Sequence, residues 1–550
     1  MKKTNDRSVP IRTKTDTPPD KNKEDRNKSG GRAVKTVAIM MGATVLSKLL
    51  GMLRGTLQTW TWGTTPEANA FTAASKLPLA IFDMFLSAAV LGCFIPVYNS
   101  LVSKDPSGER DMRDADRFAS VFLTFILLVC SACAVIGIIF AEPLLKIMTA
   151  GIDENDLRLA VTLTRIMFPM MIFTGAAYTL VGVLQSKGSF IAPAMISVVS
   201  NAGIVIYLAA INPLLGDKGI YGLAAAFVIS WFIQFATLII PLIRCGFSFR
   251  FNFDFKDGSL RKALRMAPPI MAGSWLSPMG ILLGQYFASR VALGSGISGA
   301  ATVFDCANNV YVMIAGTLTY SICNYTFPKL SRLAGNDDEG FASTILGGLV
   351  SALFISVPFM AAALVLSGEG VSILYRRGAF TAEDAANTAA VLRAMLPAMP
   401  FFCVTELFSR VFYSKNLVKI PMLASIAGIA ANALTGSALV RFGIGGVAAV
   451  GAANAVGQVI SAIMLIYFAV RRIPGLIDRK LIFELMRVLL GGGIVFGISA
   501  VISTLVSSEP YTAAFFTNVV KAFVIFLPAA AVYIVFAKLT HTGVFGKNRL

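Results

Sequence analysis

Charged and polar side chains interrupt two long apolar stretches near the start of the chain. Ser47, Lys48 and Arg54 lie in the first stretch, and Lys76 and Asp83 lie in the second. A charged side chain inside a membrane-spanning helix is costly and normally faces a polar cavity. At about 100° per residue, Ser47 and Arg54 share one helix face, and Lys76 and Asp83 share another. The two stretches therefore predict a polar cavity between membrane helices.

Lys48 and Arg54 are the cations on which this prediction depends. They are well separated in angle around a straight helix, so a bend at Gly51 would be needed to turn both toward one cavity. The alternative is that each side chain extends along the helix to place its charge at the membrane surface. That alternative is stronger for Arg54, which lies near the predicted outer end of its helix. We favour a cavity position for Lys48, which lies deeper.

Two later stretches also carry ionisable residues. Asp305 is followed by Asn309 in the eighth stretch, and Glu406 and Arg410 are spaced i,i+4 in the tenth. This last spacing favours a structural ion pair on one helix face. An excess of positive charge in the cavity suits an anionic substrate, because Arg and Lys both bind diphosphate oxygens well. The candidate substrate-binding residues are Ser47, Lys48, Arg54, Lys76, Asp83 and Asn309.

The elements that position these residues are membrane-spanning helices. Hydrophobic residues make up 56% of the chain and charged residues 14%, with a mean hydropathy of +0.71, whereas soluble domains carry about 25% charged residues. Backbone polar groups inside lipid must pair internally, so long apolar runs predict helices. With about 20 residues per crossing, we predict an all-α integral membrane protein with about fourteen crossings: 34–58, 70–101, 118–141, 159–186, 190–212, 219–243, 263–291, 299–326, 342–367, 386–414, 418–440, 444–470, 481–506 and 515–538.

The loop charges predict the orientation. Basic loops alternate regularly with loops that are short or acidic, so the positive-inside rule places both termini in the cytoplasm. The net charge of +18 fits this topology and an attraction to anionic lipids. We expect residues 1–33 to be a disordered basic tail and not a nucleic-acid-binding module.

An internal repeat divides the predicted crossings into two lobes. Arg165-Ile-Met-Phe-Pro169 recurs as Arg393-Ala-Met-Leu-Pro397, and each is followed at the same separation by a Lys. The copies begin six helices apart, which indicates a parallel repeat, as in two-lobed secondary transporters. The predicted organisation is a tail (1–33), a first lobe (34–243), a cytoplasmic linker (244–262), a second lobe (263–470), two extra helices (481–538) and a C-terminal tail (539–550).

Several classes of chemistry have no motif in the sequence. No nucleotide-binding Gly-Lys-Ser/Thr loop is present, so we expect no nucleotide partner. The single histidine, His541, follows the last apolar stretch, and the pair Cys130 and Cys133 lies inside an apolar helix without further ligands. We therefore expect no enzyme activity, no cofactor and no confident metal site. A coupling cation or the membrane potential stays open as the driving force.

Several strings resemble the MurJ (MviN) family of lipid II flippases. The first is Leu46-Ser-Lys-Leu-Leu-Gly-Met-Leu-Arg54, followed by Ser75-Lys-Leu-Pro78 and Phe94-Ile-Pro-Val-Tyr98. Ile373-Leu-Tyr-Arg-Arg-Gly-Ala-Phe-Thr381 and Leu407-Phe-Ser-Arg-Val-Phe-Tyr413 resemble a later region of the same family. The similarity runs from about residue 37 to residue 540, and it implies the multidrug/oligosaccharidyl-lipid/polysaccharide exporter (MOP) fold, related to the MATE transporters.

The resemblance implies that lipid-linked peptidoglycan precursor crosses the bacterial plasma membrane by alternating access. The family's cationic cavity would map to Lys48 and Arg54, and the two extra helices would form a groove for the polyprenyl tail. The chain departs from the family pattern where Phe82 and Asn309 replace expected arginines and Gly55 replaces an acidic residue. Asn432 is a weak candidate for a cation site, because its expected carboxylate neighbour is Gly436.

Three classes of function follow. The first is a flippase for the undecaprenyl-diphosphate-linked precursor lipid II, or for another polyprenyl-linked oligosaccharide. The second is a cation-coupled exporter of small molecules or drugs, for which twelve helices would suffice. A membrane glycosyltransferase is the third, but it would need larger loops than the sequence offers. For the flippase we expect a monomer with the lipid-linked precursor and membrane lipids as its partners.

Overall fold

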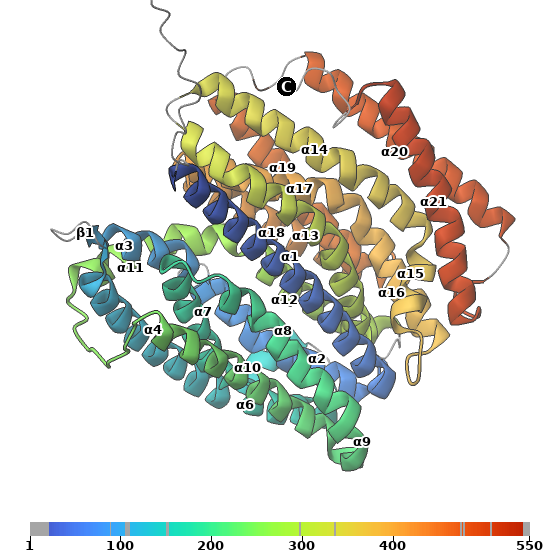
Figure 1. Ribbon diagram of the computed structural model, residues 1–550. Coiled ribbons are helices and arrows are strands. Elements are labelled where there is room, and N and C mark those ends of the chain that lie inside the picture. The colour runs from blue at the N-terminus through green and yellow to red at the C-terminus, as the bar shows by residue number, and fades with distance from the viewer. Residues whose placement is uncertain are drawn as a thin grey trace, which may run out of the picture.

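A computed structural model describes residues 21–87, 90–104, 110–149, 153–295, 299–334, 337–473, 476, 479–506 and 509–542. Most of the described part of every predicted crossing is helical (Figure 1). The first half of the chain forms α1 (Lys21–Trp62), α2 (Pro66–Phe82), the π-helical segments η1 (Asp83–Ser87) and η2 (Val90–Phe94), α3 (Ile95–Ser100), the antiparallel pair β1 (Ser103–Lys104) and β2 (Arg110–Asp111), α4 (Arg113–Ile139), α5 (Ala141–Met148), α6 (Glu154–Met167), α7 (Met170–Ser186), α8 (Ile191–Ile206), η3 (Tyr207–Ile211), α9 (Asn212–Leu215), η4 (Gly216–Lys218) and α10 (Gly219–Arg244).

The second half also consists of long helices joined by short segments. It forms α11 (Gly258–Ser274), α12 (Leu276–Ser295), α13 (Ala300–Leu333), α14 (Asp338–Val365), α15 (Ser367–Tyr375), α16 (Ala382–Met395), η5 (Leu396–Ala398), α17 (Met399–Ser414), α18 (Lys419–Arg441), α19 (Ala448–Arg472), α20 (Arg479–Leu505) and α21 (Phe515–Leu539).

Helix α1 begins inside the predicted N-terminal tail. Residues 21–33 were predicted to be disordered, but they are helical. Extending an existing helix adds one hydrogen bond per ordered residue, whereas starting a helix is the unfavourable step. The apolar part of α1 can therefore support a polar extension. Residues 1–20 and 543–550 of the predicted tails lie outside the described residues.

Length and apolar composition identify most of the crossings directly. Nine helical segments of the described residues are long and apolar enough to cross a membrane, and Ile191–Arg244 alone contains two predicted crossings. The predicted crossings outside these segments belong to α1, α2, α11 with α12, and α13. Three of these helices carry Lys48 and Arg54 (α1), Lys76 (α2) and Asp305 (α13). The polar character of these helices reflects the cavity that they line.

The internal repeat is visible in the order of the helices. A long helix, a short helix and a broken crossing form the series α4, α5, α6 and α7, and the same series recurs as α14, α15, α16 and α17. Both breaks coincide with a proline, Pro169 between α6 and α7 and Pro397 between α16 and α17. Proline lacks the backbone N–H and its ring disturbs the preceding turn, so it interrupts a helix. The repeated sequence motif therefore has a repeated structural effect.

The buried side chains form separate cores in the two halves of the bundle. One core extends from Ala70 to Ala267, and two others extend together from Phe287 to Leu481. The first part of α11, including Leu260 and Ala263, packs into the first core, although the sequence analysis assigns residue 263 to the second lobe. This part of α11 contacts η1, η2 and α4 of the first lobe. The seventh crossing thus contacts both lobes.

The helix pair α20 and α21 lies along one flank of the second lobe, shown in orange and red in Figure 1. Helix α20 packs against α14, and α21 packs against α15. The ammonium of Lys521 on α21 lies 3.0 Å from a carboxylate oxygen of Glu369 on α15, and both side chains are almost fully buried. The hydroxyl of Tyr533 donates a hydrogen bond of 2.7 Å to the carbonyl of Phe354 on α14. The pair is therefore fixed to the second lobe by polar as well as apolar contacts.

Candidate functional site

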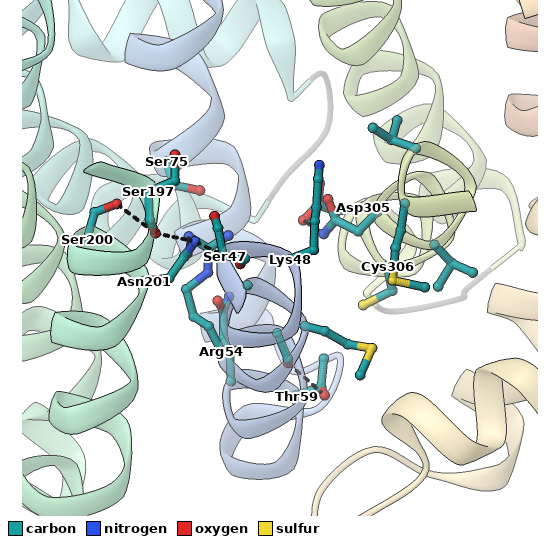
Figure 2. A pocket seen from close by; sticks show the side chains of 18 of the residues that line it. Ser47, Lys48, Arg54, Thr59, Ser75, Ser197, Ser200, Asn201, Asp305 and Cys306 are labelled. Carbon is teal, nitrogen blue, oxygen red and sulfur yellow. Dashed lines mark hydrogen bonds between the residues drawn. The ribbon is translucent and has the colours of Figure 1, made fainter. Parts of the chain in front are cut away.

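A polar cavity of about 500 Å³ lies between the two lobes (Figure 2). It is lined by α1, α2, α8 and α10 from the first half of the chain and by α13 and the end of α15 from the second. The sequence-predicted residues Ser47, Lys48, Arg54, Lys76 and Asn309 all line it. Helix α1 is continuous through Gly51, so the cavity extends around α1 far enough to include Lys48 and Arg54 without a break in the helix.

Arg54 is held by neutral groups. Its guanidinium donates a hydrogen bond of 2.9 Å to the amide oxygen of Asn201 on α8. The guanidinium carbon also lies 5.5 Å from the centre of the Phe227 ring on α10, within the range of a cation–π interaction. Among the described residues, no salt bridge includes Arg54. Its positive charge is therefore oriented by neutral groups and has no ion-pair partner within 4.0 Å among the described residues.

Ser47 and Lys48 lie about two turns of helix from Arg54. The amide nitrogen of Asn201 donates to the carbonyl of Ser47 at 3.4 Å, so this one side chain contacts both ends of the polar part of α1. The Lys48 side chain is exposed to the cavity, and no salt bridge in the described part of the chain includes it. The cavity thus contains two cations that have no carboxylate partner in the described residues.

Lys76 forms an ion pair across the two lobes. Its ammonium, on α2, lies 2.5 Å from a carboxylate oxygen of Asp305 on α13. The other carboxylate oxygen of Asp305 accepts a hydrogen bond of 3.2 Å from the amide of Asn309. These two predicted substrate-binding residues therefore meet at a carboxylate that the sequence analysis noted but did not assign to the site. The charge of Lys76 is neutralised in this conformation.

Asp83 lies outside this arrangement. It is exposed at the end of α2, where the π-helical segment η1 begins, and it is not among the residues that line the cavity. Seven residues of helix place it about 10 Å along the axis from Lys76. The shared helix face predicted from the spacing therefore does not bring both side chains into the same cavity.

The predicted ion pair on α17 is present. A guanidinium nitrogen of Arg410 lies 3.8 Å from a carboxylate oxygen of Glu406, and the guanidinium also lies 5.8 Å from the centre of the Tyr320 ring. Neither residue of the pair lines the cavity. Asn432 is buried on α18, and no group of three or more His, Cys, Asp or Glu side chains in the described residues could hold a metal ion.

The lobes also meet at the end of the bundle where α1 stops. The hydroxyl of Thr64 donates 2.6 Å to the carboxylate of Asp384, and the N–H of Ala379 donates 2.9 Å to the carbonyl of Trp60. Gly378 has a φ of +58° and lies against Trp60, where a side chain would overlap the indole. These contacts hold the two lobes together at that end of the bundle.

Three further residues line the cavity and were not predicted from the sequence: Asn201, Phe227 and Tyr375. Asn201 could have been found, because it is an amide in the middle of a largely apolar crossing. Tyr375 lies within one of the family-like strings. Phe227 gives no signal, because phenylalanine is common in apolar helices and its role depends on the position of Arg54.

This chain is similar in sequence to a family of known membrane proteins. The family model described as "Lipid II flippase MurJ" matches residues 60–540. A probable lipid II flippase MurJ from Bdellovibrio bacteriovorus is 25% identical over 484 residues, which cover 87% of this chain and 89% of the relative. The corresponding protein of Vibrio cholerae is 24% identical over 412 residues, which cover 73% of this chain and 77% of the relative.

Solved structures show the same fold. The chain superposes on a lipid II flippase MurJ in an inward closed conformation with a TM-score of 0.74 and 20% identity, covering 92% of this chain and 99% of that one. A multidrug resistance MATE transporter of the MOP superfamily, in an inward-facing conformation, gives a TM-score of 0.61 and 15% identity, covering 80% of this chain and 98% of that one. The similarity to the MATE transporter covers less of this chain than the similarity to the MurJ structure.

Proposed function

The chain belongs to the MurJ family of lipid II flippases, and on that premise we propose that it carries lipid II from the cytoplasmic to the outer leaflet by alternating access. It is a multi-pass protein of the bacterial plasma membrane and a transporter, not an enzyme. The undecaprenyl-diphosphate-linked precursor is its substrate. Both termini lie in the cytoplasm, and the protein acts as a monomer.

The observation that carries this proposal is the unneutralised charge in the cavity. Arg54 and Lys48 face a space between the lobes, and Asp305 is already engaged by Lys76 and Asn309. A cation held away from bulk water is costly unless an anion or a water-filled cavity compensates it. A diphosphate supplies two phosphate groups whose oxygens can accept hydrogen bonds from both side chains. Ser47 and Asn309 would add neutral polar contacts to the head group.

Alternating access requires the two lobes to separate and to close again. The Lys76–Asp305 ion pair joins the lobes within the cavity, and the Thr64–Asp384 hydrogen bond joins them at one end. In the proposed cycle the substrate diphosphate enters the cavity and competes with Asp305 for Lys76, and the Thr64–Asp384 contact breaks afterwards, when that end opens to release the substrate. Asp83 is not a ligand in this conformation, because it lies outside the cavity.

The helices α20 and α21 are proposed to guide the polyprenyl tail. They lie outside the internal repeat and present many exposed apolar side chains, including Leu489, Phe516 and Phe523. Either a coupling cation or the membrane potential would drive the cycle, and no cofactor is needed. Asn432 is a weak candidate for a residue of the cation site.

A flipping assay in reconstituted vesicles tests the substrate. Lipid II should be flipped faster than an undecaprenyl-diphosphate lipid that carries an unrelated oligosaccharide, and apolar drugs should not be transported. The double variant Lys48→Ala, Arg54→Ala provides the matched inactive control. Equal rates for both lipids would favour the alternative of a broader polyprenyl-glycan flippase, to which the departures at Phe82 and Asn309 also point. Drug transport without lipid flipping would overturn the proposal.

A further inference from the structure

Five phenylalanines alternate with polar residues in the segment that joins α10 to α11. They are Phe247, Phe249, Phe251, Phe253 and Phe255, and we name residues 247–255 the phenylalanine strap. The strap is neither helical nor part of the described strands. Successive ring centres from Phe249 to Phe255 lie 4.8, 6.4 and 6.1 Å apart, so the rings form one continuous row.

The strap is fixed to α4 at several points. The N–H of Asn252 donates a hydrogen bond of 3.2 Å to the hydroxyl of Thr124. A guanidinium nitrogen of Arg117 lies 3.2 Å from the carboxylate of Asp254, and the ring of Phe125 lies 6.0 Å from that of Phe255. Phe247 is buried at 3% exposure. The strap therefore has a defined position on the surface of the first lobe.

This position corresponds to the edge of the membrane. Arg117 is the last charged residue of α4, and Thr124 lies seven residues further into its apolar part, about 10 Å along the helix axis. Non-helical backbone exposed to lipid does not occur in the hydrocarbon core, because its polar groups would lack partners. The strap must therefore lie in the interfacial layer, where water still reaches the backbone.

The outer face of the strap is aromatic and unusually exposed. Phe251 is 68% exposed and Phe253 is 62% exposed, although both belong to a fixed segment. Aromatic side chains are favoured at the membrane–water interface, where an apolar ring can enter the boundary of the acyl chains. The two rings therefore have the position and the chemistry to contact lipid.

Positive charge surrounds these rings. Six exposed basic residues lie in or next to the strap: Arg244, Arg250, Lys256, Arg261, Lys262 and Arg265. The two acidic residues of this region are both engaged, since Asp254 pairs with Arg117 and Asp257 accepts hydrogen bonds from the first N–H groups of α11. The charge available to a partner is therefore positive.

We propose that the phenylalanine strap is a binding site for anionic phospholipids at the membrane surface. The rings of Phe251 and Phe253 insert at the top of the acyl chains, and Arg250 and Lys256 bind the phosphate groups of neighbouring lipids. Such a site lies on the flank of the first lobe, next to the first part of α11, which contacts both lobes. It is separate from the central cavity, whose lining includes no residue of the strap.

Fluorescence quenching tests the insertion of the rings. The full-length variant Phe251→Trp is reconstituted in vesicles whose lipids are brominated near the top of the acyl chain. The quenching of the natural protein, which has four tryptophans, gives the baseline. Brominated phosphatidylglycerol should quench the added tryptophan. Phe247→Trp is the matched control. Phe247 belongs to the same strap but is buried, so lipid should not quench a tryptophan at that position. Absence of quenching at position 251 would mean that protein or water, not lipid, covers the rings, and it would overturn the proposal.

A second measurement tests the selectivity for anionic lipid. Brominated phosphatidylglycerol should quench Trp introduced at position 251 more strongly than brominated phosphatidylcholine at the same mole fraction. Adding Arg250→Gln and Lys256→Gln should reduce this preference by about fivefold per charge, since each basic residue near an anionic surface contributes about 1 kcal/mol. Lys218→Gln removes an exposed charge on η4, at the opposite end of α10 from the strap, and it should leave the lipid preference unchanged. A preference that survives the double substitution would contradict the assignment of these two side chains.

Discussion

At the scale of single residues, the charge of Arg54 is oriented by an amide and a phenyl ring, and Lys48 faces the cavity without a salt bridge in the described residues. A hydrogen bond to a charged group contributes about 1.5–3 kcal/mol, so the loss of one contact should weaken diphosphate binding roughly ten- to hundredfold. Lys48→Ala and Arg54→Ala should each impair flipping, and Lys48→Arg should be tolerated because the charge is kept.

The measurement is complementation of cells depleted of their own flippase, with the protein level determined in parallel. Glu406→Gln is a useful comparison, because its ion pair with Arg410 lies outside the cavity. This variant should lower the protein level while the activity per molecule stays the same. Full complementation by the Lys48→Ala, Arg54→Ala double variant would show that α1 does not hold the diphosphate.

Asn201 provides a sharper test of the role of Arg54. The amide orients the guanidinium without neutralising it. In Asn201→Asp the new carboxylate would form an ion pair with Arg54 and compete with the substrate, so the affinity for an undecaprenyl-diphosphate lipid should fall by about tenfold or more. Asn201→Ala should have a smaller effect, because the charge of Arg54 stays available. Binding by the purified variants gives the comparison, and an Asp variant that binds as well as the natural protein would exclude Arg54 as a ligand.

At the scale of helices, α20 and α21 can be removed to test the proposed tail groove. Truncation after Ile473 should abolish flipping of lipid II while the two lobes still insert. The truncation also removes Lys521 and leaves Glu369 in a buried position without its ammonium partner. A broken buried ion pair costs about 3–5 kcal/mol, so the truncated chain should also carry Glu369→Gln. The truncated variant should lose flipping activity even when its membrane level matches that of full-length Glu369→Gln. Continued flipping at that level would contradict the groove.

The helices could be predicted from sequence much better than their contacts. Apolar runs predicted the long helices that the described residues form, and the repeated prolines Pro169 and Pro397 marked equivalent positions, at which the structure has helix breaks. The Lys76–Asp305 pair could not be predicted, because its members lie on helices whose approach depends on the docking of both lobes. Spacing within one helix instead suggested Asp83 as the neighbour of Lys76. Periodicity describes a single helix, and only the packing of several helices decides which charges meet.

At the scale of the whole molecule, the alternation of basic and non-basic loops predicts the topology. Cysteines introduced at Ser107 and Asp217 should be labelled from opposite sides of the membrane, with Ser107 on the cytoplasmic side. The native cysteines in the described residues are buried or half-buried, so they should react slowly with a membrane-impermeant reagent. Labelling of both positions from one side would contradict the predicted number of crossings between them and the proposed direction of transport.

The buried pair of Glu369 and Lys521 also has a consequence for the synthesis and membrane insertion of the protein. During synthesis α15 enters the membrane long before α21 leaves the ribosome, so Glu369 is made well before the ammonium of Lys521 can reach it. The arrival of the last helix brings Lys521 within 3.0 Å of Glu369. The packing of α15 is therefore completed by α21, and a chain interrupted before Lys521 leaves Glu369 without this ion-pair partner.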